Sequence, residues 1–263
     1  MSILLAALFV RVEQASPRPV FPLSLITAYP FRNILMSTLS ITIAINTLYF
    51  NVPIYFQAVL LDSATNSGLR LMAITAGGLV AGTSTGLVIA RWGRTNPPMQ
   101  LGFVLINVTM VLATCFTRDW SALQYSAVLA LAGFSAAMYY PASWMAVLAS
   151  TKRQCDMAAT NTILLVTRSV GSVLAIALSS LVLQNSLSAY LDENVQGPDR
   201  LDVIARVREA VEAVRDLDEP YREQVRRSYE MACKTTFEAI LAVVVMGLFA
   251  VWGIRHLPRI VKK

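Results

Sequence analysis

The chain has 263 residues, of which 56% are hydrophobic and only 14% charged, and its formal net charge is +6. This composition is too apolar for an ordinary soluble domain, and the apolar residues come in runs long enough to span a bilayer. The composition therefore indicates a membrane protein, and the placement of the positive charge in short loops argues against nucleic-acid binding.

The residue types used in catalysis and metal binding are sparse. Cys115, Cys155 and Cys233 are scattered and form no CxxC pair, so neither a disulfide framework nor a zinc site is predicted. The single histidine is His256, in the C-terminal tail. Because the chain also lacks a phosphate-binding glycine loop and a dinucleotide-binding motif, we expect no enzyme, no cofactor and no metal site.

Residues 1–32 are expected to be the end of a preceding helix and a cytosolic linker. Ser2–Val10 is apolar but too short to cross a bilayer. It also lacks the basic region and the small-residue cleavage site of a signal peptide. This segment predicts that the sequence is a fragment that begins near the end of a span.

Six apolar segments near the length of a membrane helix follow. The predicted spans are Asn33–Phe56, Ser67–Ala90, Met99–Thr117, Leu123–Leu148, Ala158–Leu183 and Thr235–Ile254. They divide the chain into five transmembrane helices at 33–183, a long connection at 184–234, and a last helix with a basic tail at 235–263.

Lysine and arginine residues gather in the short loops on one side of these spans. That side carries Arg11, Arg18, Arg32, Arg91, Arg94, Lys152, Arg153, Arg255, Arg259, Lys262 and Lys263. The other side has only Arg70 and Arg118 in short loops, and the connection at 184–234 is net acidic. By the positive-inside rule, we expect both ends of the six-span set in the cytosol and the long connection on the lumenal or external side.

Within that connection, the segment Arg200–Leu217 is predicted to form an amphipathic helix. Asp202 and Arg206 have the spacing of a helical ion pair. Its apolar residues recur at helical spacing, as Ile204, Val207, Val211 and Val214, between Pro198 and Pro220. A solvated or membrane-surface helix is the simpler interpretation, because amphipathy requires only one apolar surface. A cap over the lumenal mouth is the alternative.

The second span carries one small residue per turn at Gly78, Gly82 and Gly86, which predicts a packing seam for a neighbouring helix. The span then enters "GLVIARWGRTN", Gly86–Asn96. This stretch resembles the loop signature of the major facilitator superfamily, G-x-x-x-D-R-x-G-R-R.

Gly86, Arg91, Gly93 and Arg94 match that signature, whereas Ala90 replaces its acidic residue and Thr95 its last basic one. In the family this loop forms a cytosolic charge-relay latch, and the missing carboxylate removes one of its groups. The alternative function of these arginines is to anchor the topology.

The resemblance extends over nearly the whole chain and is closest to the fungal 14-helix drug:H⁺ antiporters. It is carried by "FNVPIYFQAVLLDSATNSGLRL" (50–71), "GFSAAMYYPASWMAVLA" (133–149) and "RSVGSVLAIALSSLVLQNSL" (168–187). The segment "GPDRLDVIARVREAVEAVRDLDEPYREQV" (197–225) most resembles the branch with vacuolar amino-acid transporters.

The resemblance implies an all-α membrane protein, the six-helix C-terminal bundle of a major facilitator fold, whose N-terminal six-helix half is missing. It also implies proton-coupled transport of a small solute such as an amino acid, at the vacuolar membrane rather than the plasma membrane. A multidrug or toxin exporter of the plasma membrane is one alternative. A truncated membrane protein that transports nothing is the other.

By analogy with the family, the first and fourth helices of a bundle line the substrate cavity. Asn46 and Tyr49 lie in the first span, and Tyr139 and Tyr140 lie in the fourth. We therefore expect these four residues to contact substrate. The equally open alternative is that they form interhelical hydrogen bonds, worth about 0.6 kcal/mol each.

Arg168 is the strongest candidate for a functional group in the bilayer. If its helix begins near Ala158, the arginine lies roughly 15 Å into the span. At that depth, inserting an arginine into the membrane costs about 2.5–3.5 kcal/mol on translocon-based scales. A helix that begins at Ile163 would instead let it snorkel to the headgroups. Glu238 is the only carboxylate within the spans and lies near an interface, so a proton-coupling carboxylate is expected in the missing half.

Overall fold

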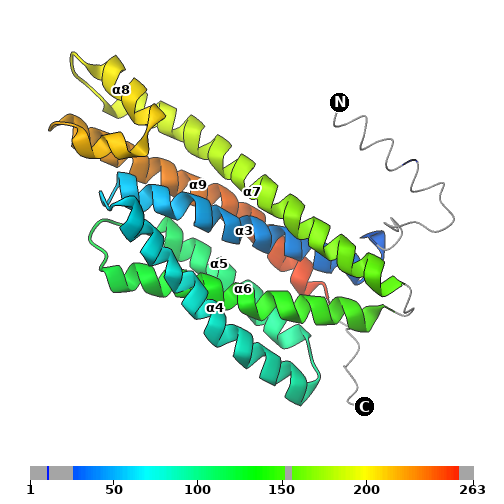
Figure 1. The fold of residues 1–263 in the computed structure, drawn as a ribbon. Coiled ribbons are helices and arrows are strands. Elements are labelled where there is room, and N and C mark those ends of the chain that lie inside the picture. The colour runs from blue at the N-terminus through cyan, green and yellow to red at the C-terminus, as the bar shows by residue number, and fades with distance from the viewer. Residues whose placement is uncertain (1–10, 12–25, 152–155, 255–263) are drawn as a thin grey trace.

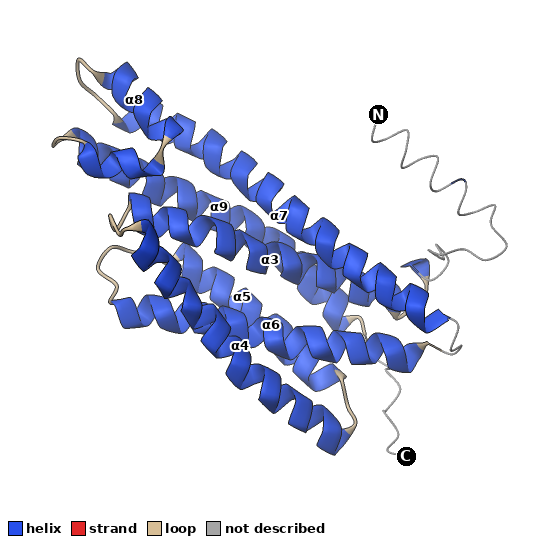
Figure 2. Ribbon diagram, viewed as in Figure 1, coloured by secondary structure: helices blue, strands red, loops and turns tan. Residues whose placement is uncertain are grey.

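The computed structural model describes residue 11, residues 26–151 and residues 156–254. Ser2–Val10, Lys152, Arg153, His256 and the basic tail lie outside the described residues. Within the described part all regular structure is helical, and six helices are long and apolar enough to cross a membrane (Figures 1 and 2). They are α3 (Phe31–Ala58), α4 (Ala64–Trp92), α5 (Asn96–Thr114), α6 (Ala122–Ser150), α7 (Asp156–Asn194) and α9 (Tyr221–Trp252). The predicted fold class, an all-α membrane bundle, is confirmed.

Successive spanning helices run in opposite directions, so the bundle has two ends. We call the end with the α4–α5 loop the basic end. The other end, with the α3–α4 and α5–α6 loops, is called the cap end (Figure 1). In the cap-end loops, the Ser63 side chain accepts a hydrogen bond from the backbone N–H of Asn66, and Ser121 forms a capping box with Gln124. These caps satisfy backbone donors at the first turns of α4 and α6.

The spanning helices form two groups joined side by side. α4 and α5 pack against α6, α3 and α7 pack against α9, and α5 also packs against α9. α6 and α7 meet only lightly, although both lie next to α3. This arrangement leaves room between α3, α6 and α7, on the face where the candidate site lies.

Two helices are much longer than predicted. α7 continues to Asn194 and α9 begins at Tyr221, whereas the predicted spans ended at Leu183 and began at Thr235. At 1.5 Å per residue α7 is about 58 Å long, nearly twice the hydrocarbon thickness of about 30 Å. The hydropathy of the sequence predicts only the apolar part of each helix. In α7, Leu187 and Leu191 lie after that part and are still buried in the core. The predicted loop at 184–234 is therefore largely helical.

The predicted amphipathic helix is present but interrupted. It forms α8 (Arg200–Glu209) and a short 3-10 helix, η1 (Val211–Asp216), separated by the extended residue Ala210. The predicted Asp202–Arg206 ion pair is confirmed, at 2.8 Å. Val207 and Val214 are fully buried against the bundle, so the apolar face packs on protein rather than on solvent or a membrane surface. We call α8 and η1 together the cap.

The glycine seam lies one residue away from its predicted position. A Cβ on Gly77 would lie 2.0 Å from the carbonyl oxygen of Ala130, and one on Gly133 would lie 1.7 Å from that of Ile74. Hence α4 and α6 approach backbone to backbone, which only glycine permits at these two positions. A Cβ on Gly78 would lie 3.6 Å from the Gly133 carbonyl oxygen. One on Gly82 or Gly86 would meet nothing within 4 Å, so no described helix packs on the predicted seam at those two residues.

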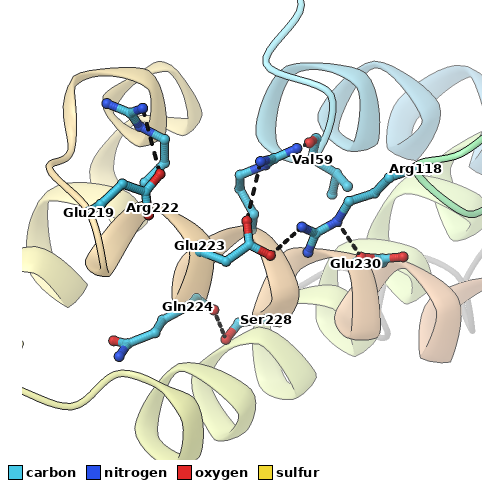
Figure 3. A network of polar contacts seen from close by, with 9 residues as sticks. Val59, Arg118, Glu219, Arg222, Glu223, Gln224, Ser228 and Glu230 are labelled. Carbon is cyan, nitrogen blue, oxygen red and sulfur yellow. Dashed lines mark hydrogen bonds and ion pairs between the residues drawn. The ribbon is translucent and has the colours of Figure 1, made fainter.

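A network of charged residues ties the cap end together. Figure 3 shows Arg118, from the α5–α6 loop, donating to Glu223 and to Glu230 of α9; the bond to Glu230 is 2.8 Å long. Arg226 pairs with Glu223 at 3.2 Å and donates to the carbonyl of Val59 at 2.9 Å. Partial burial lowers the pKa of Arg118, but its hydrogen bonds to the two glutamates outweigh that effect and raise it. The guanidinium therefore stays charged at physiological pH.

Candidate functional site

An open groove with a volume of about 750 Å³ lies between α3, α6 and α7. Seven of its ten lining residues have polar or charged side chains. It consists of Thr42, Ile45, Asn46 and Tyr49 of α3, Ala136 and Tyr140 of α6, and Leu165, Arg168, Ser169 and Ser172 of α7. We call this set the groove. Four of the five residues predicted to contact substrate lie in it: Asn46, Tyr49, Tyr140 and Arg168.

Hydrogen bonds hold the three helices of the groove in register. The Asn46 Nδ2 donates to the carbonyl of Thr42 at 2.9 Å, and its Oδ1 accepts from the Ser172 hydroxyl at 3.0 Å. The hydroxyls of Thr42 and Tyr140 lie 3.1 Å apart and share a hydrogen bond. Asn46 thus links α3 to α7, and Thr42 links α3 to α6. The predicted interhelical role of Asn46 is confirmed by these bonds, while a contact with substrate stays a prediction.

Arg168 is held by an aromatic ring. Its guanidinium carbon lies 4.0 Å from the centre of the Tyr140 ring, well within cation–π distance. The groove lining contains no aspartate or glutamate. Among the described residues, none of the ion pairs includes Arg168. The guanidinium therefore has unused donors that face the groove.

A smaller hollow of about 270 Å³ continues along the other side of Arg168. Tyr140, Leu165 and Arg168 line both hollows. The second one adds Trp144, whose indole N–H donates to the Asn161 Oδ1 at 2.9 Å. Arg168 therefore stands between two hollows, and an occupant of either one lies within its reach.

Tyr139 lies apart from the groove. Its side chain is fully buried, and its hydroxyl bonds with those of Ser37 and Thr38 and with the Ile34 carbonyl. Neighbouring residues on a helix point about 100° apart, so Tyr139 and Tyr140 face different sides of α6. Within this bundle Tyr139 serves the packing of α3 against α6.

Within the described residues, the loop motif forms the C-terminal end of α4, and its arginines form no ion pair. Gly93 has φ 63° and donates its N–H to the Ile89 carbonyl at 2.9 Å, which closes the helix in a left-handed conformation suited to glycine. Arg91 lies in the last turn of α4, where a cation interacts favourably with the helix dipole. Arg91, Arg94 and Gly86 are exposed, and no ion pair of the described residues includes either arginine.

Sequence reasoning missed several residues of the site. Thr42 and Ser172 are ordinary polar residues of apolar helices, and no local pattern sets them apart from the many others. Trp144 and Asn161 pair between the consecutive helices α6 and α7, and their hydrogen bond depends on how the two helices face each other, which a single sequence does not reveal. Glu238 is exposed on α9 and lies outside the groove.

The groove has the chemistry of a binding site for a small polar solute. It offers an amide, several hydroxyls, two aromatic rings and one cation, with no carboxylate, histidine or cysteine in its lining. Such groups orient a solute and bind an anionic group on it. Glu, His and Cys groups that commonly transfer protons or attack substrates are absent from the lining.

A six-helix bundle with a polar groove beside its first, fourth and fifth helices has the fold of one half of a major facilitator transporter. The structure is similar to that of a bacterial homologue of the human lysosomal transporter Spinster, in an inward-facing and occupied conformation. The TM-score is 0.65 at 14% identity, covering 95% of this chain and 54% of that one.

The sequence relatives are fungal transporters. The chain is 24% identical to multidrug resistance protein fnx1 of Schizosaccharomyces pombe, over 94% of this chain and 47% of that protein. It is 28% identical to MFS-type transporter GME11371 of Pestalotiopsis microspora, over 78% of this chain and 38% of that protein. It is 24% identical to vacuolar basic amino acid transporter 2 of Saccharomyces cerevisiae, over 74% of this chain and 41% of that protein. No family model matches the chain.

The chain therefore spans about half the length of the curated relatives that it matches, which fits the predicted C-terminal half. The helices and the relatives together make it an integral, multi-pass membrane protein related to fungal major facilitator transporters.

Proposed function

We propose that the intact protein carries a small polar solute across a membrane and that the groove is one wall of its solute site. The observation that carries the proposal is the unpaired Arg168 on the Tyr140 ring, in a lining made mostly of hydroxyl and amide groups. An arginine is costly in a membrane-spanning helix, and such residues mark solute pathways.

A second six-helix half supplies the opposite wall in this proposal. The half-length match to the relatives supports it, as does the open side of the groove. Transport then follows alternating access, in which the two halves rock about a solute held between them. The same arrangement makes the bilayer, the solute and the second half the partners of this chain.

The solute is an amino acid, exchanged for protons at the vacuolar membrane. The α-carboxylate of an amino acid would give Arg168 the acceptor that it lacks, through charge-assisted hydrogen bonds. A relative named as a vacuolar basic amino acid transporter supports this choice of solute and membrane. Because the groove has no aspartate, glutamate or histidine, the proton-coupling group belongs to the second half.

Multidrug or toxin export at the plasma membrane is the second candidate. It is favoured by the relative named as a multidrug resistance protein and by the partly exposed rings of Tyr49 and Trp144. The Arg168 guanidinium in the groove favours the amino acid, because it offers charge-assisted hydrogen bonds to a carboxylate. A truncated protein that transports nothing is the third possibility, and the same assay separates all three.

The test is uptake into vacuolar vesicles from a yeast strain that expresses the native protein from its own gene. With an ATP-driven proton gradient, [¹⁴C]histidine, [¹⁴C]lysine and [¹⁴C]arginine are supplied in turn, and rhodamine 6G serves as the drug probe. We expect proton-dependent uptake of at least one amino acid. Transport of rhodamine alone would favour the drug exporter, and transport of no probe would contradict both.

Arg168→Ala should abolish that uptake while leaving the protein abundance in the vesicles unchanged. Arg168→Lys keeps the charge but loses the planar fork that binds a carboxylate with two bonds, so we expect partial uptake. Normal uptake by Arg168→Ala would remove the arginine from the solute site. A fall in abundance would instead show that Arg168 serves the fold.

A further inference from the structure

A third pocket, of about 240 Å³, lies under the cap. It is formed by α3, α7, the cap and α9. Its lining consists of Phe50 and Ile54 of α3, Ser180, Leu183, Gln184, Leu187 and Ser188 of α7, Arg208 and Val211 of the cap, and Tyr229 of α9. We call it the mouth pocket. The groove and the mouth pocket share no lining residue.

The mouth pocket follows the groove along the same seam between α3 and α7. The bond between Asn46 and Ser172 fixes the register of these two parallel helices. Phe50 lies one turn beyond Asn46, and Ser180 lies about 12 Å beyond Ser172 at 1.5 Å per residue. Both steps lead toward the cap end. A solute that travels between the cap end and the groove along this seam passes the mouth pocket.

The cap holds a cation at this pocket. The Tyr229 hydroxyl donates to the carbonyl of Val207 at 3.1 Å, and the Val207 side chain is buried. This contact anchors the residue directly before Arg208. Two other arginines of α8 are neutralised, because Arg200 pairs with Asp192 at 3.0 Å and Arg206 pairs with Asp202 at 2.8 Å.

Among the residues that the structure describes, Arg208 has no such partner. None of the ion pairs among the described residues includes it, and the mouth pocket has no aspartate or glutamate in its lining. A positive group beside Gln184 and two serine hydroxyls suits a carboxylate, which accepts hydrogen bonds from all of them. Phe50 and Ile54 of α3, with two leucines of α7, add an apolar part to the lining, which suits an aliphatic or aromatic side chain.

The size of the pocket limits its occupant. Sites for drug-sized ligands usually have volumes of about 300–1,000 Å³. The groove falls in that range, whereas the mouth pocket lies below it. The occupant is therefore a small molecule of amino-acid size.

We propose that the mouth pocket is a second binding site for the transported solute, occupied before or after the groove. It takes a small solute that carries a carboxylate and an aliphatic or aromatic side chain, such as the ring of histidine, and Arg208 binds the carboxylate. The inference rests on the proposed function for the identity of the solute, but the pocket itself can be tested by binding alone.

The kinetic test compares two arginines of the same helix in the native protein. Uptake of [¹⁴C]histidine into vesicles is measured over a range of concentrations for Arg208→Ala and for Arg206→Ala. Both variants remove one positive charge from α8, but only Arg208 lines the mouth pocket. We expect KM to rise several-fold in Arg208→Ala with kcat unchanged, and Arg208→Lys to restore part of the loss. Equal KM values for the two alanine variants would overturn the proposal.

The binding test does not require transport. Ser188→Cys places a thiol in the lining, in a protein whose Cys115 and Cys155 are replaced by serine. Labelling of the detergent-solubilised protein by a maleimide is then timed with and without histidine at about 10 mM, a saturating concentration for millimolar binding. We expect histidine to slow labelling in this protein and not after Arg208→Ala is added. Unprotected labelling in a protein that takes up histidine would contradict the mouth pocket alone, whereas protection without uptake would contradict only the proposed function.

Discussion

Arg168 illustrates how an arginine can be kept in a membrane helix without a carboxylate. The Tyr140 ring lies 4.0 Å from its guanidinium and stabilises the cation through the ring quadrupole, by about 0.5–2 kcal/mol. Tyr140 is itself oriented by its hydrogen bond with Thr42. The charge is thus positioned by two side chains that leave its donors open to the groove.

Replacing Tyr140 with leucine should weaken solute binding. The ring and the bond to Thr42 are both lost, so Arg168 is no longer held in one position. We expect KM for uptake to rise about 2- to 30-fold, which corresponds to the cation–π energy given above. Concentration-dependent uptake into vesicles provides the measurement.

Tyr139→Phe is the matched control on the adjacent residue. It removes a buried hydroxyl that bonds with Ser37 and Thr38, and the free energy of unfolding should fall by about 1 kcal/mol. KM should stay at the wild-type value, because Tyr139 does not line the groove. A larger KM effect from Tyr139→Phe than from Tyr140→Leu would show that the groove is assigned to the wrong face of α6.

At the scale of elements, the contact between α4 and α6 depends on two glycines. Gly77→Val would place carbon atoms against the backbone of Ala130, and the helices would have to separate. Overpacking of this kind usually costs about 1–3 kcal/mol. We expect a lower midpoint of thermal unfolding in detergent, followed by intrinsic fluorescence.

Gly82→Ala is the control on the same helix, because a Cβ at this position has no atom within 4 Å. Alanine is the better helix former by about 1 kcal/mol, so this variant should match or exceed the wild-type midpoint. Comparable losses in both variants would mean that the close approach of α4 and α6 is not centred on Gly77.

The cap-end network predicts a separate contribution to stability. Arg118→Met removes the ion pairs with Glu223 and Glu230, which join the α5–α6 loop to α9 (Figure 3). These groups are partly exposed, so we expect a loss of about 1 kcal/mol that shrinks as salt is added. Arg206→Met removes one exposed helical pair and should cost about 0.3–0.5 kcal/mol. A salt-independent loss in Arg118→Met would indicate packing rather than charge.

For the whole molecule, the sequence predicts the six spans and their order because bilayer depth demands long apolar runs. It does not predict where α7 and α9 end. Residues such as Leu187 stabilise those extensions through contacts between distant segments, and the surrounding polar residues lower the hydropathy. Periodicity likewise places Tyr139 and Tyr140 mid-helix without deciding which one faces the groove.

The count of basic residues in the loops distinguishes the two ends of the bundle. The structure shows in addition that two arginines at the cap end form ion pairs. Arg70, near the start of α4, and Arg118, in the α5–α6 loop, are both paired with carboxylates. Arg168 and Arg208 differ from them in having no such partner in the described part of the chain. Both of these arginines line hollows, and this contrast is the basis for proposing a solute path along α3 and α7.

The central claim is that the groove holds the solute, and the most direct measurement is protection of a thiol placed in it. Ser169→Cys, in native protein with Cys115 and Cys155 replaced by serine, is labelled with a small maleimide while histidine is added. Thr83→Cys, exposed on α4 outside the groove, is the control. The account predicts that histidine slows labelling at position 169 and not at position 83. Labelling at position 169 that histidine does not slow, in vesicles that accumulate histidine, would contradict it.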